Sequence, residues 1–286
     1  MSILAYFSYP VFVRALVACL LSGGILSLVG IVIVVLNLTT MRFALMHIAL
    51  LGSAIALILS FSPIWGALLA IACGAWFLGP LSDKLKIDTG LSSALFMTGS
   101  LALAFFLFYQ AGLPAMEAFD VFSGNILALS KEDIYSLVIV SAVVLILVVC
   151  FYREIQLVLY NSELAETLGI QSKLVRNLML LISGLAIGVS MRLVGALLVD
   201  AIILLPALGG LQLGSSLVTA SLCTSLIGLT STVLGLLVSL YFNWPLGVTI
   251  TLTGVIVLLV VTLAKRFIKK GVFAKEGLAV KKEVDR

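Results

Sequence analysis

Charged side chains are scarce in this sequence. Only 10% of its 286 residues are Asp, Glu, Lys or Arg, whereas a soluble globular domain carries about a quarter. Hydrophobic residues make up 62%, which leaves too little polar surface to cover a water-soluble globule of this size. The composition therefore excludes a water-soluble protein and predicts an all-α, polytopic membrane protein.

Polar motifs are missing as well. The chain has no Gly-x-x-x-x-Gly-Lys-Ser/Thr loop to cradle phosphates, so we do not expect it to hydrolyse nucleotide. Its start lacks the pattern of a cleaved signal peptide, and the first apolar segment is expected to be retained. The cysteines lie in apolar segments without motif-like spacing, which favours small buried hydrophobes over disulfides or a zinc cluster. They are Cys19, Cys73, Cys150 and Cys223.

Apolar stretches of roughly 20 residues, the length that crosses a bilayer as a helix, are abundant. Length and charge predict nine spans. The second, sixth and seventh are short, as in transporters that break helices at a cavity, and Pro206 with the pair Gly209 and Gly210 should end the seventh early. The predicted spans are Val11–Leu36, Ala44–Ser60, Ile64–Leu81, Ser92–Gln110, Ile134–Tyr152, Leu178–Ser190, Val194–Gly209, Leu217–Phe242 and Leu246–Ala264.

Lys and Arg are distributed unequally between the loops, and cytoplasmic loops carry the excess of these cations. An outside N-terminus and a cytoplasmic C-terminus leave only Arg14, Lys131 and Arg192 outside, with Arg42 among the cations inside. We expect a transmembrane domain over residues 1–267 and a basic cytoplasmic tail over 268–286. The net charge of +4 then reflects sidedness and contact with anionic lipid, and is poor evidence for nucleic-acid binding.

Two polar loops interrupt the apolar pattern. Ala111–Asp133, predicted outside, is either a connector or a docking surface for an external partner. Arg153–Asn177, predicted inside, contains a short helix that Ser162 can cap and Gly169 can end in a left-handed conformation. One side of this helix is apolar and has to be buried, either against the bilayer surface or in a groove on a cytoplasmic protein. The apolar residues are Leu164, Ala165 and Leu168, and the acids are Glu163 and Glu166.

Four stretches, taken in order, resemble the permease subunits of zinc and manganese ABC importers, the metal-type ABC-3 permeases. Thr40–Gly52 (TMRFALMHIALLG) is similar to the family's Asp-Ala-Leu-Ser-His-Ala segment, and Ser123–Ser130 (SGNILALS) to its outer-loop pattern Phe-Gly-Asn-Ile-Leu. Asn161–Gly169 (NSELAETLG) matches the family's coupling helix. Val194–Ala207, followed by Trp244–Ile250, resembles the family's last third. The resemblance covers most of the chain.

The resemblance implies an importer in the cell membrane built from two permease copies, a cytoplasmic ATPase dimer and an external metal-binding protein. ATP would be hydrolysed on the separate ATPase, and the coupling helix at about 162–169 would transmit its closure as alternating access. Packing and helix breaks are expected at Gly184, Gly188, Gly195 and Pro206, the first two forming a Gly-x-x-x-Gly pattern for close helix approach. No permanently bound cofactor is expected, only a transported zinc or manganese ion.

His47, the single histidine, matches the family's pore histidine, but Phe43 stands where the family has its acid. Manganese prefers oxygen ligands, so a carboxylate is needed from elsewhere. Asp200 lies in an apolar run, where an acid costs roughly 2.5–3.5 kcal/mol at mid-membrane. We predict that it replaces the missing acid. The alternatives are a buried His47 hydrogen-bonded to a carbonyl, and a structural Asp200 that pairs with Arg192 or a helix end.

Other interpretations remain open from the sequence. Soft ligands from Met41, Met46 and Met191 are less favoured than packing roles, because methionine in helices usually fills space. An ABC permease for a metal chelate or vitamin would share the coupling turn, but should be longer and lack a pore histidine. A secondary transporter should show repeats and more intramembrane charges. A membrane scaffold subunit is a further alternative.

Overall fold

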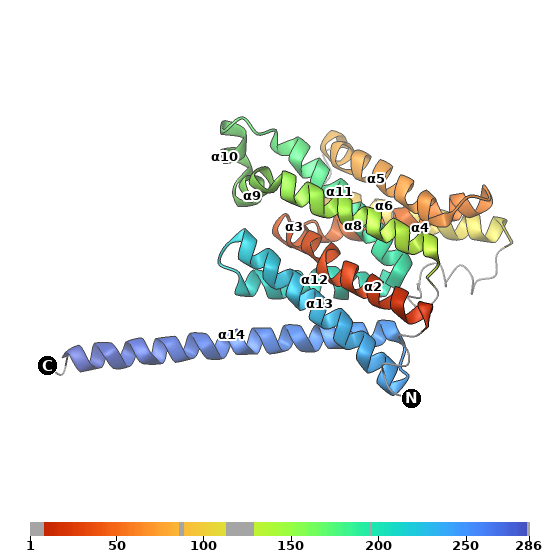
Figure 1. Cartoon of the computed structure of the whole chain (residues 1–286). Helices are drawn as coiled ribbons and strands as arrows, with labels where there is room; N and C mark the ends of the chain where they lie inside the picture. Colours follow the sequence, from red (N-terminus) through yellow and green to blue (C-terminus); the bar gives the residue numbers. More distant parts are fainter. Residues whose placement is uncertain (1–8, 86–88, 113–128, 195, 285–286) are drawn as a thin grey trace.

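The structure is a computed structural model that describes residues 9–85, 89–112, 129–194 and 196–284. The side chains of 78–85, 89, 189, 192–194, 196, 197, 200 and 268–284 are not described. The described residues form a helical bundle (Figure 1). Its helices are α2 (Pro10–Gly24), η1 (Leu26–Leu28), α3 (Val29–Val35), α4 (Thr39–Ile58), α5 (Pro63–Leu85), α6 (Thr89–Gln110), α8 (Lys131–Cys150), α9 (Tyr152–Tyr160), α10 (Ser162–Thr167), α11 (Ser172–Val194), α12 (Ala196–Leu213), α13 (Leu217–Phe242) and α14 (Leu246–Val284).

The described residues of the nine predicted segments lie mostly in helices, and α13 has the predicted bounds. In the described part of the chain, six helices are long and apolar enough to cross a membrane. The prediction that nine segments span the bilayer stays a prediction. The six helices are Pro10–Val35, Thr39–Ile58, Gly90–Gln110, Lys131–Cys150, Leu217–Phe242 and Leu246–Phe267.

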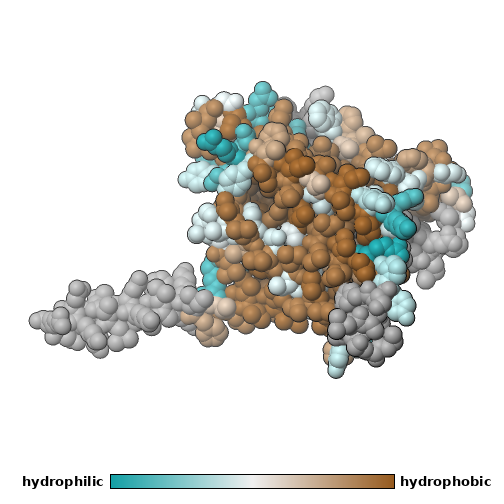
Figure 2. All heavy atoms as spheres, in the orientation of Figure 1, coloured by the Kyte–Doolittle hydropathy of each residue, from teal (hydrophilic) through white to brown (hydrophobic). Residues whose placement is uncertain are grey.

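The surface of the bundle agrees with a membrane environment. Figure 2 shows a broad hydrophobic band, with hydrophilic residues gathered towards the two ends of the helices. Large apolar side chains such as Leu69, Phe106 and Leu226 are exposed on this surface. In water such a surface would drive aggregation, whereas acyl chains solvate it at no cost.

The predicted short segments are longer than expected. The sixth segment was bounded by charge, yet α11 runs from Ser172 to Val194 and includes Lys173 and Arg176. The second begins at Thr39 instead of Ala44. A helix does not have to end where the hydrocarbon ends, because its last turns extend into headgroups and water with their backbone hydrogen bonds intact. The helices α4 and α11 are therefore longer than the predicted spans, and the lengths of the parts that cross the bilayer stay a prediction.

The α-helix of the first predicted span is interrupted. A 3-10 turn, η1, separates α2 from α3, and here the chain comes very close to its neighbours. A Cβ on Gly30 would meet the carbonyl oxygen of Ile203 on α12, and the Ser225 hydroxyl on α13 donates to the carbonyl of Gly24 at 2.7 Å. The first span is thus held by backbone contacts with α12 and α13.

Pro206 does not end the seventh span, because α12 continues through it to Leu213. The two glycines after it also have a role other than termination. An added Cβ on Gly210 would meet the Thr224 side chain and the Ala220 carbonyl of α13. Tertiary packing against α13 outweighs the hydrogen bond that proline removes, as is common in membrane helices.

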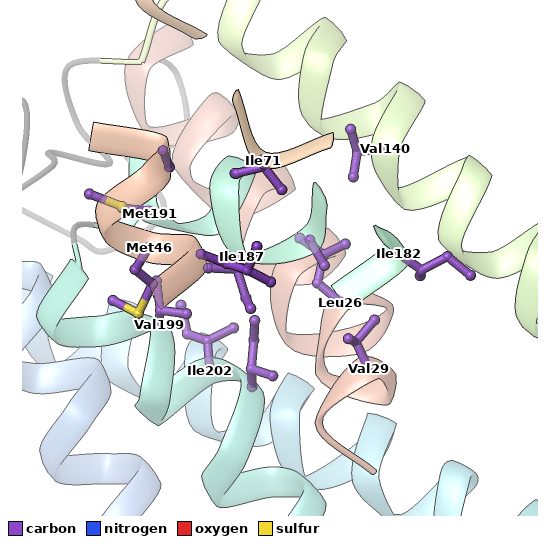
Figure 3. Packing of buried hydrophobic residues seen from close by; sticks show 14 of the residues in the cluster. Leu26, Val29, Met46, Ile71, Val140, Ile182, Ile187, Met191, Val199 and Ile202 are labelled. Atoms are coloured by element: carbon purple, nitrogen blue, oxygen red, sulfur yellow. The ribbon is translucent and has the colours of Figure 1, made fainter. Parts of the chain in front are cut away.

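The core forms where α11 passes between α4, α5 and α12 (Figure 3). Ile187 and Met191 of α11, Ile71 of α5 and Ile202 of α12 are buried together in one cluster. Met41 and Met46 lie in the same cluster, as expected for packing methionines. The prediction of buried cysteines holds only for Cys19. Cys73 and Cys150 are exposed on the outer surface of the bundle and Cys223 is half-buried, although all four are free thiols.

Candidate functional site

His47 lies on α4, a helix packed between α5 and α6 and also in contact with α11. Its side chain is 8% exposed, and its Nδ1 lies 2.7 Å from the carbonyl oxygen of Phe43, one turn earlier. A carbonyl only accepts hydrogen bonds, so Nδ1 carries a proton in this contact and Nε2 is the ring nitrogen that could bind a metal. The same geometry serves a structural histidine and a metal ligand, since ligating histidines commonly donate their second nitrogen to a carbonyl.

Arg42 lies next to this carbonyl contact and is deeply buried. Its side chain is 2% exposed, its guanidinium carbon stands 4.3 Å from the Phe43 ring centroid, and its Nη1 lies 3.7 Å from the Met46 sulfur. The sequence counts Arg42 among the cytoplasmic loop cations, but α4 begins early enough to include it. Where the resemblance expects an acid, the chain therefore has an aromatic ring that faces a buried cation.

The possible metal ligands around His47 are few among the described residues. Arg42 and His47 are five positions apart, which separates them by about 7.5 Å along the helix axis and by roughly 140° around it. Among the side chains that the structure describes, no three His, Cys, Asp or Glu residues form a metal-binding group. A metal beside His47 thus needs an acid from outside this set.

Asp200 belongs to α12, but its side chain falls outside the described residues, as do Gly195 and the side chain of Arg192. Its pairing with His47 or with Arg192 therefore stays a prediction. The neighbours on both sides, Val199 and Ala201, are buried. Met46, next to His47, and Val199, next to Asp200, belong to the same core cluster (Figure 3).

The short helix predicted between residues 162 and 169 is α10. Its N-cap is Asn161, whose side-chain oxygen accepts hydrogen bonds from the backbone N–H groups of Glu163 and Leu164 at 2.9 and 3.0 Å. The predicted cap, Ser162, is wrong by one position, because Asn161 has the extended backbone of an N-cap while Ser162 is already helical. The expected left-handed glycine is present, with φ of +83° at Gly169.

The apolar side of α10 is divided between the protein interior and the surface. Ala165 is fully buried, whereas Leu164 is 43% and Leu168 63% exposed. Tyr160, just before the helix, is 82% exposed. We call Tyr160, Leu164 and Leu168 the α10 apolar patch, and the described residues of the chain leave it exposed.

A groove of about 780 Å³ lies beside α10. Trp76 of α5 forms part of its wall, with Leu174 and Leu178 of α11 and the turn from Gly169 to Ser172. The Ser172 hydroxyl donates a hydrogen bond to the Glu166 carboxylate, which connects α10 to the start of α11. This hydrogen bond is a direct contact between α10 and α11.

The helix α11 carries the Gly-x-x-x-Gly pattern. A Cβ on Gly184 would lie 2.5 Å from Ile71 Cγ2 of α5 and 3.4 Å from Leu45 Cδ1 of α4, and one on Gly188 would also meet Ile71. Both glycines thus let α11 approach α5 closely.

Residues 113–128 of the predicted outer loop lie outside the described residues, so its docking role stays a prediction.

Comparisons with known proteins agree across nearly the whole chain. Residues 8–265 match the model of the ABC 3 transport family. A manganese import system permease protein of Streptococcus gordonii is 28% identical over 266 residues, covering 91% of this chain and 94% of the relative. A probable iron transport system membrane protein of Haemophilus influenzae is 25% identical, covering 84% and 85%. The solved structure of PsaBC from Streptococcus pneumoniae in complex with Fab has a TM-score of 0.79 and 25% identity, covering 88% and 91%.

Proposed function

The chain belongs to the ABC 3 transport family, and from this premise we propose that it is the permease subunit of an ATP-driven importer of manganese or zinc. It is a multi-pass protein of the cell membrane, consistent with its apolar helices and its relatives. The observation that carries the proposal is the match to a manganese import permease over 91% of the chain, together with a solved neighbour of the same fold. The permease itself is not the enzyme; the ATPase is a separate chain.

The assembly we propose contains two copies of this chain, a cytoplasmic ATPase dimer and an external metal-binding protein. Nine spans with the N-terminus outside and the C-terminus inside would put α10 on the cytoplasmic side. Figure 1 supports this arrangement, because α10 and the C-terminal end of α14 project from the same side of the bundle. The start of α8, next to the predicted outer loop, lies on the opposite side.

The ATPase docks on α10 in this proposal. The α10 apolar patch is exposed and supplies a helix face of the kind that enters a groove on a partner. Bilayer surface is a poorer occupant, because Glu163 and Glu166 are exposed on the same short helix and anionic headgroups would repel them. Closure of the ATPases would then move α10, and with it α11 through the Glu166 and Ser172 contact.

Co-purification with the ATPase tests this docking. The variant carries Leu164→Asp together with Leu168→Asp, and the matched control carries Leu174→Asp, an exposed leucine at the start of α11. We expect the double variant to lose the ATPase while its melting temperature stays within about 2 °C, since surface changes rarely alter stability. Retention of the ATPase by the double variant would contradict docking at α10.

The metal path passes His47 and Asp200 in this proposal, with Asp200 in place of the acid that is absent at Phe43. An acid is required because a lone imidazole is a poor cation site, and no three His, Cys, Asp or Glu side chains among the described residues form a metal-binding group. A histidine plus carboxylate set accepts manganese and zinc alike, so the ligand types do not distinguish the two ions.

Uptake by the reconstituted permease and ATPase complex tests the cargo and the path separately. Manganese, zinc and ferrous iron are offered singly and in competition, to wild type and to Asp200→Asn. We expect ATP-dependent uptake of manganese or zinc and at least a tenfold loss in the variant. Uptake of iron alone, or only of a metal chelate, would contradict the proposal that the cargo is manganese or zinc. Unchanged uptake and unchanged metal selectivity in the variant would overturn the role of Asp200.

A further inference from the structure

A second groove lies at the opposite side of the bundle, between the first turns of α2 and α8. Its volume is about 460 Å³, and its walls come from both helices. Two of its lining residues are cations, Arg14 of α2 and Lys131 of α8. The remaining lining residues are Pro10, Val13, Ile134 and Tyr135. We call this the α2–α8 groove.

The two cations are far apart in the sequence and unusual in their predicted position. Positively charged residues are disfavoured outside the membrane, and the sequence assigns only three there. Two of those three line this one groove. Like charges that share a partly apolar space repel each other unless an anion lies between them.

Arg14 is held in place by the protein. Its Nη1 donates to the carbonyl of Leu129 at 2.6 Å, and its Nε donates to the carbonyl of Pro10 at 3.3 Å. Both partners are neutral, so neither cancels its charge. Arg14 is half-buried, whereas Lys131 is exposed and able to reach a ligand.

Among the described residues, the acids near the groove lie outside its lining. Asp133 directs its carboxylate into the cap of α8, where it accepts hydrogen bonds from the backbone N–H and the hydroxyl of Ser130 at 2.9 and 2.8 Å. Glu132 is exposed and is not part of the groove lining. Both charged residues in the described lining of the groove are therefore cations.

The walls and surroundings of the groove are apolar. Val13 and Tyr135 are exposed at its edge, and the exposed apolar surface continues along α8 through Val138 and Ile139. A soluble anion would gain nothing from these walls. A molecule with an anionic head and hydrocarbon chains would be bound by both parts of the surface.

We propose that the α2–α8 groove binds an anionic phospholipid, with the phosphate between Arg14 and Lys131 and the acyl chains along the exposed faces of α2 and α8. Phosphatidylglycerol and cardiolipin have the required chemistry. The proposal depends on the membrane location of the chain and not on which metal it carries, so it stands or fails independently of the proposed function.

Lipid retention by the purified full chain tests this site. Mixed micelles containing phosphatidylglycerol or phosphatidylcholine are offered, and bound lipid is counted by native mass spectrometry. The variant is Lys131→Gln. The matched control is Lys173→Gln, which removes an exposed cation at the α10 side. We expect wild type and the control to retain phosphatidylglycerol over phosphatidylcholine, and the variant to lose about fivefold of that preference.

Three outcomes would overturn the proposal. Equal retention of the two lipids would mean that charge does not select the occupant. Equal losses in Lys131→Gln and Lys173→Gln would mean that any surface cation suffices. Displacement of the lipid by glycerol phosphate at a similar concentration would mean that a soluble anion is the ligand. Lys131 is exposed, and an unchanged elution volume of its variant excludes misfolding as the cause.

Discussion

The helices α4 and α10 both carry proposed functional residues, and they differ in what determines their properties. α10 is defined by residues within its own turn, with Asn161 at its start and Gly169 after its end. The chemistry of α4 depends instead on burial, because α5, α6 and α11 surround the helix that carries Arg42 and His47. A docking helix at the surface is thus specified locally, whereas a buried ion path is specified by the assembled bundle.

The strongest test of this contrast is Arg42→Ala. Arg42 is one of the largest fully buried side chains, so its removal leaves a cavity and abolishes the stacking on Phe43. We expect a loss of roughly 2–5 kcal/mol in the free energy of unfolding, measured by denaturation in detergent. Arg42→Lys keeps the charge and should recover part of the loss. A variant as stable as wild type would show that the burial of Arg42 does not stabilise the packing of α4.

His47→Ala should affect transport more than stability. We expect metal uptake to fall at least tenfold in the reconstituted complex, because the imidazole is the proposed ligand. Phe43→Ala serves as control: it leaves the carbonyl partner of Nδ1 in place and should retain most uptake. If both variants behave alike, His47 has only a structural role.

Gly169→Ala tests the local specification of α10. The backbone at Gly169 has φ of +83°, where an added Cβ costs roughly 1 kcal/mol. Gly99→Ala is the matched control, since Gly99 lies inside α6 with open space around it and alanine should be neutral or slightly stabilising there. Thermal unfolding of both variants in the same detergent measures the difference, and equal melting temperatures would contradict the prediction.

The smallest effect is expected at the start of α10. Asn161→Ala removes the acceptor for two backbone N–H groups and should cost about 1 kcal/mol, with weaker ATPase binding. Ser162→Ala should change the free energy of unfolding by less than about 0.5 kcal/mol, since its hydroxyl bonds only to the Val158 carbonyl at 3.4 Å. Hydrogen exchange of the α10 amides measures the effect of both variants. A larger effect for Ser162→Ala than for Asn161→Ala would show that Ser162 is the cap.

The sequence predicts features that depend on neighbouring residues better than features that depend on distant ones. The bounds of α13 follow from a long apolar run between Ser216, which caps the helix, and Asn243, which is left-handed. Pro206 leads to a wrong prediction of where α12 ends. The close approach of Gly210 to Thr224 joins α12 to α13, and a contact between two helices cannot be read from the residues next to the proline. The burial of Arg42 is missed for the same reason. One local signal was available: Arg42 stands between Met41 and Phe43 and close to the apolar run that follows.

The glycine at position 30 sets a limit on how this sequence can evolve. Any side chain there would meet the Ile203 carbonyl, and a Cβ would lie only 2.7 Å from that of Ala207. A substitution would therefore require simultaneous changes in α12, which single nucleotide changes do not supply. Outward-facing positions such as Leu20 and Leu69 have exposed side chains and can exchange with other apolar residues. We expect natural variants of this chain to differ on the lipid-facing surface and to keep glycine at position 30.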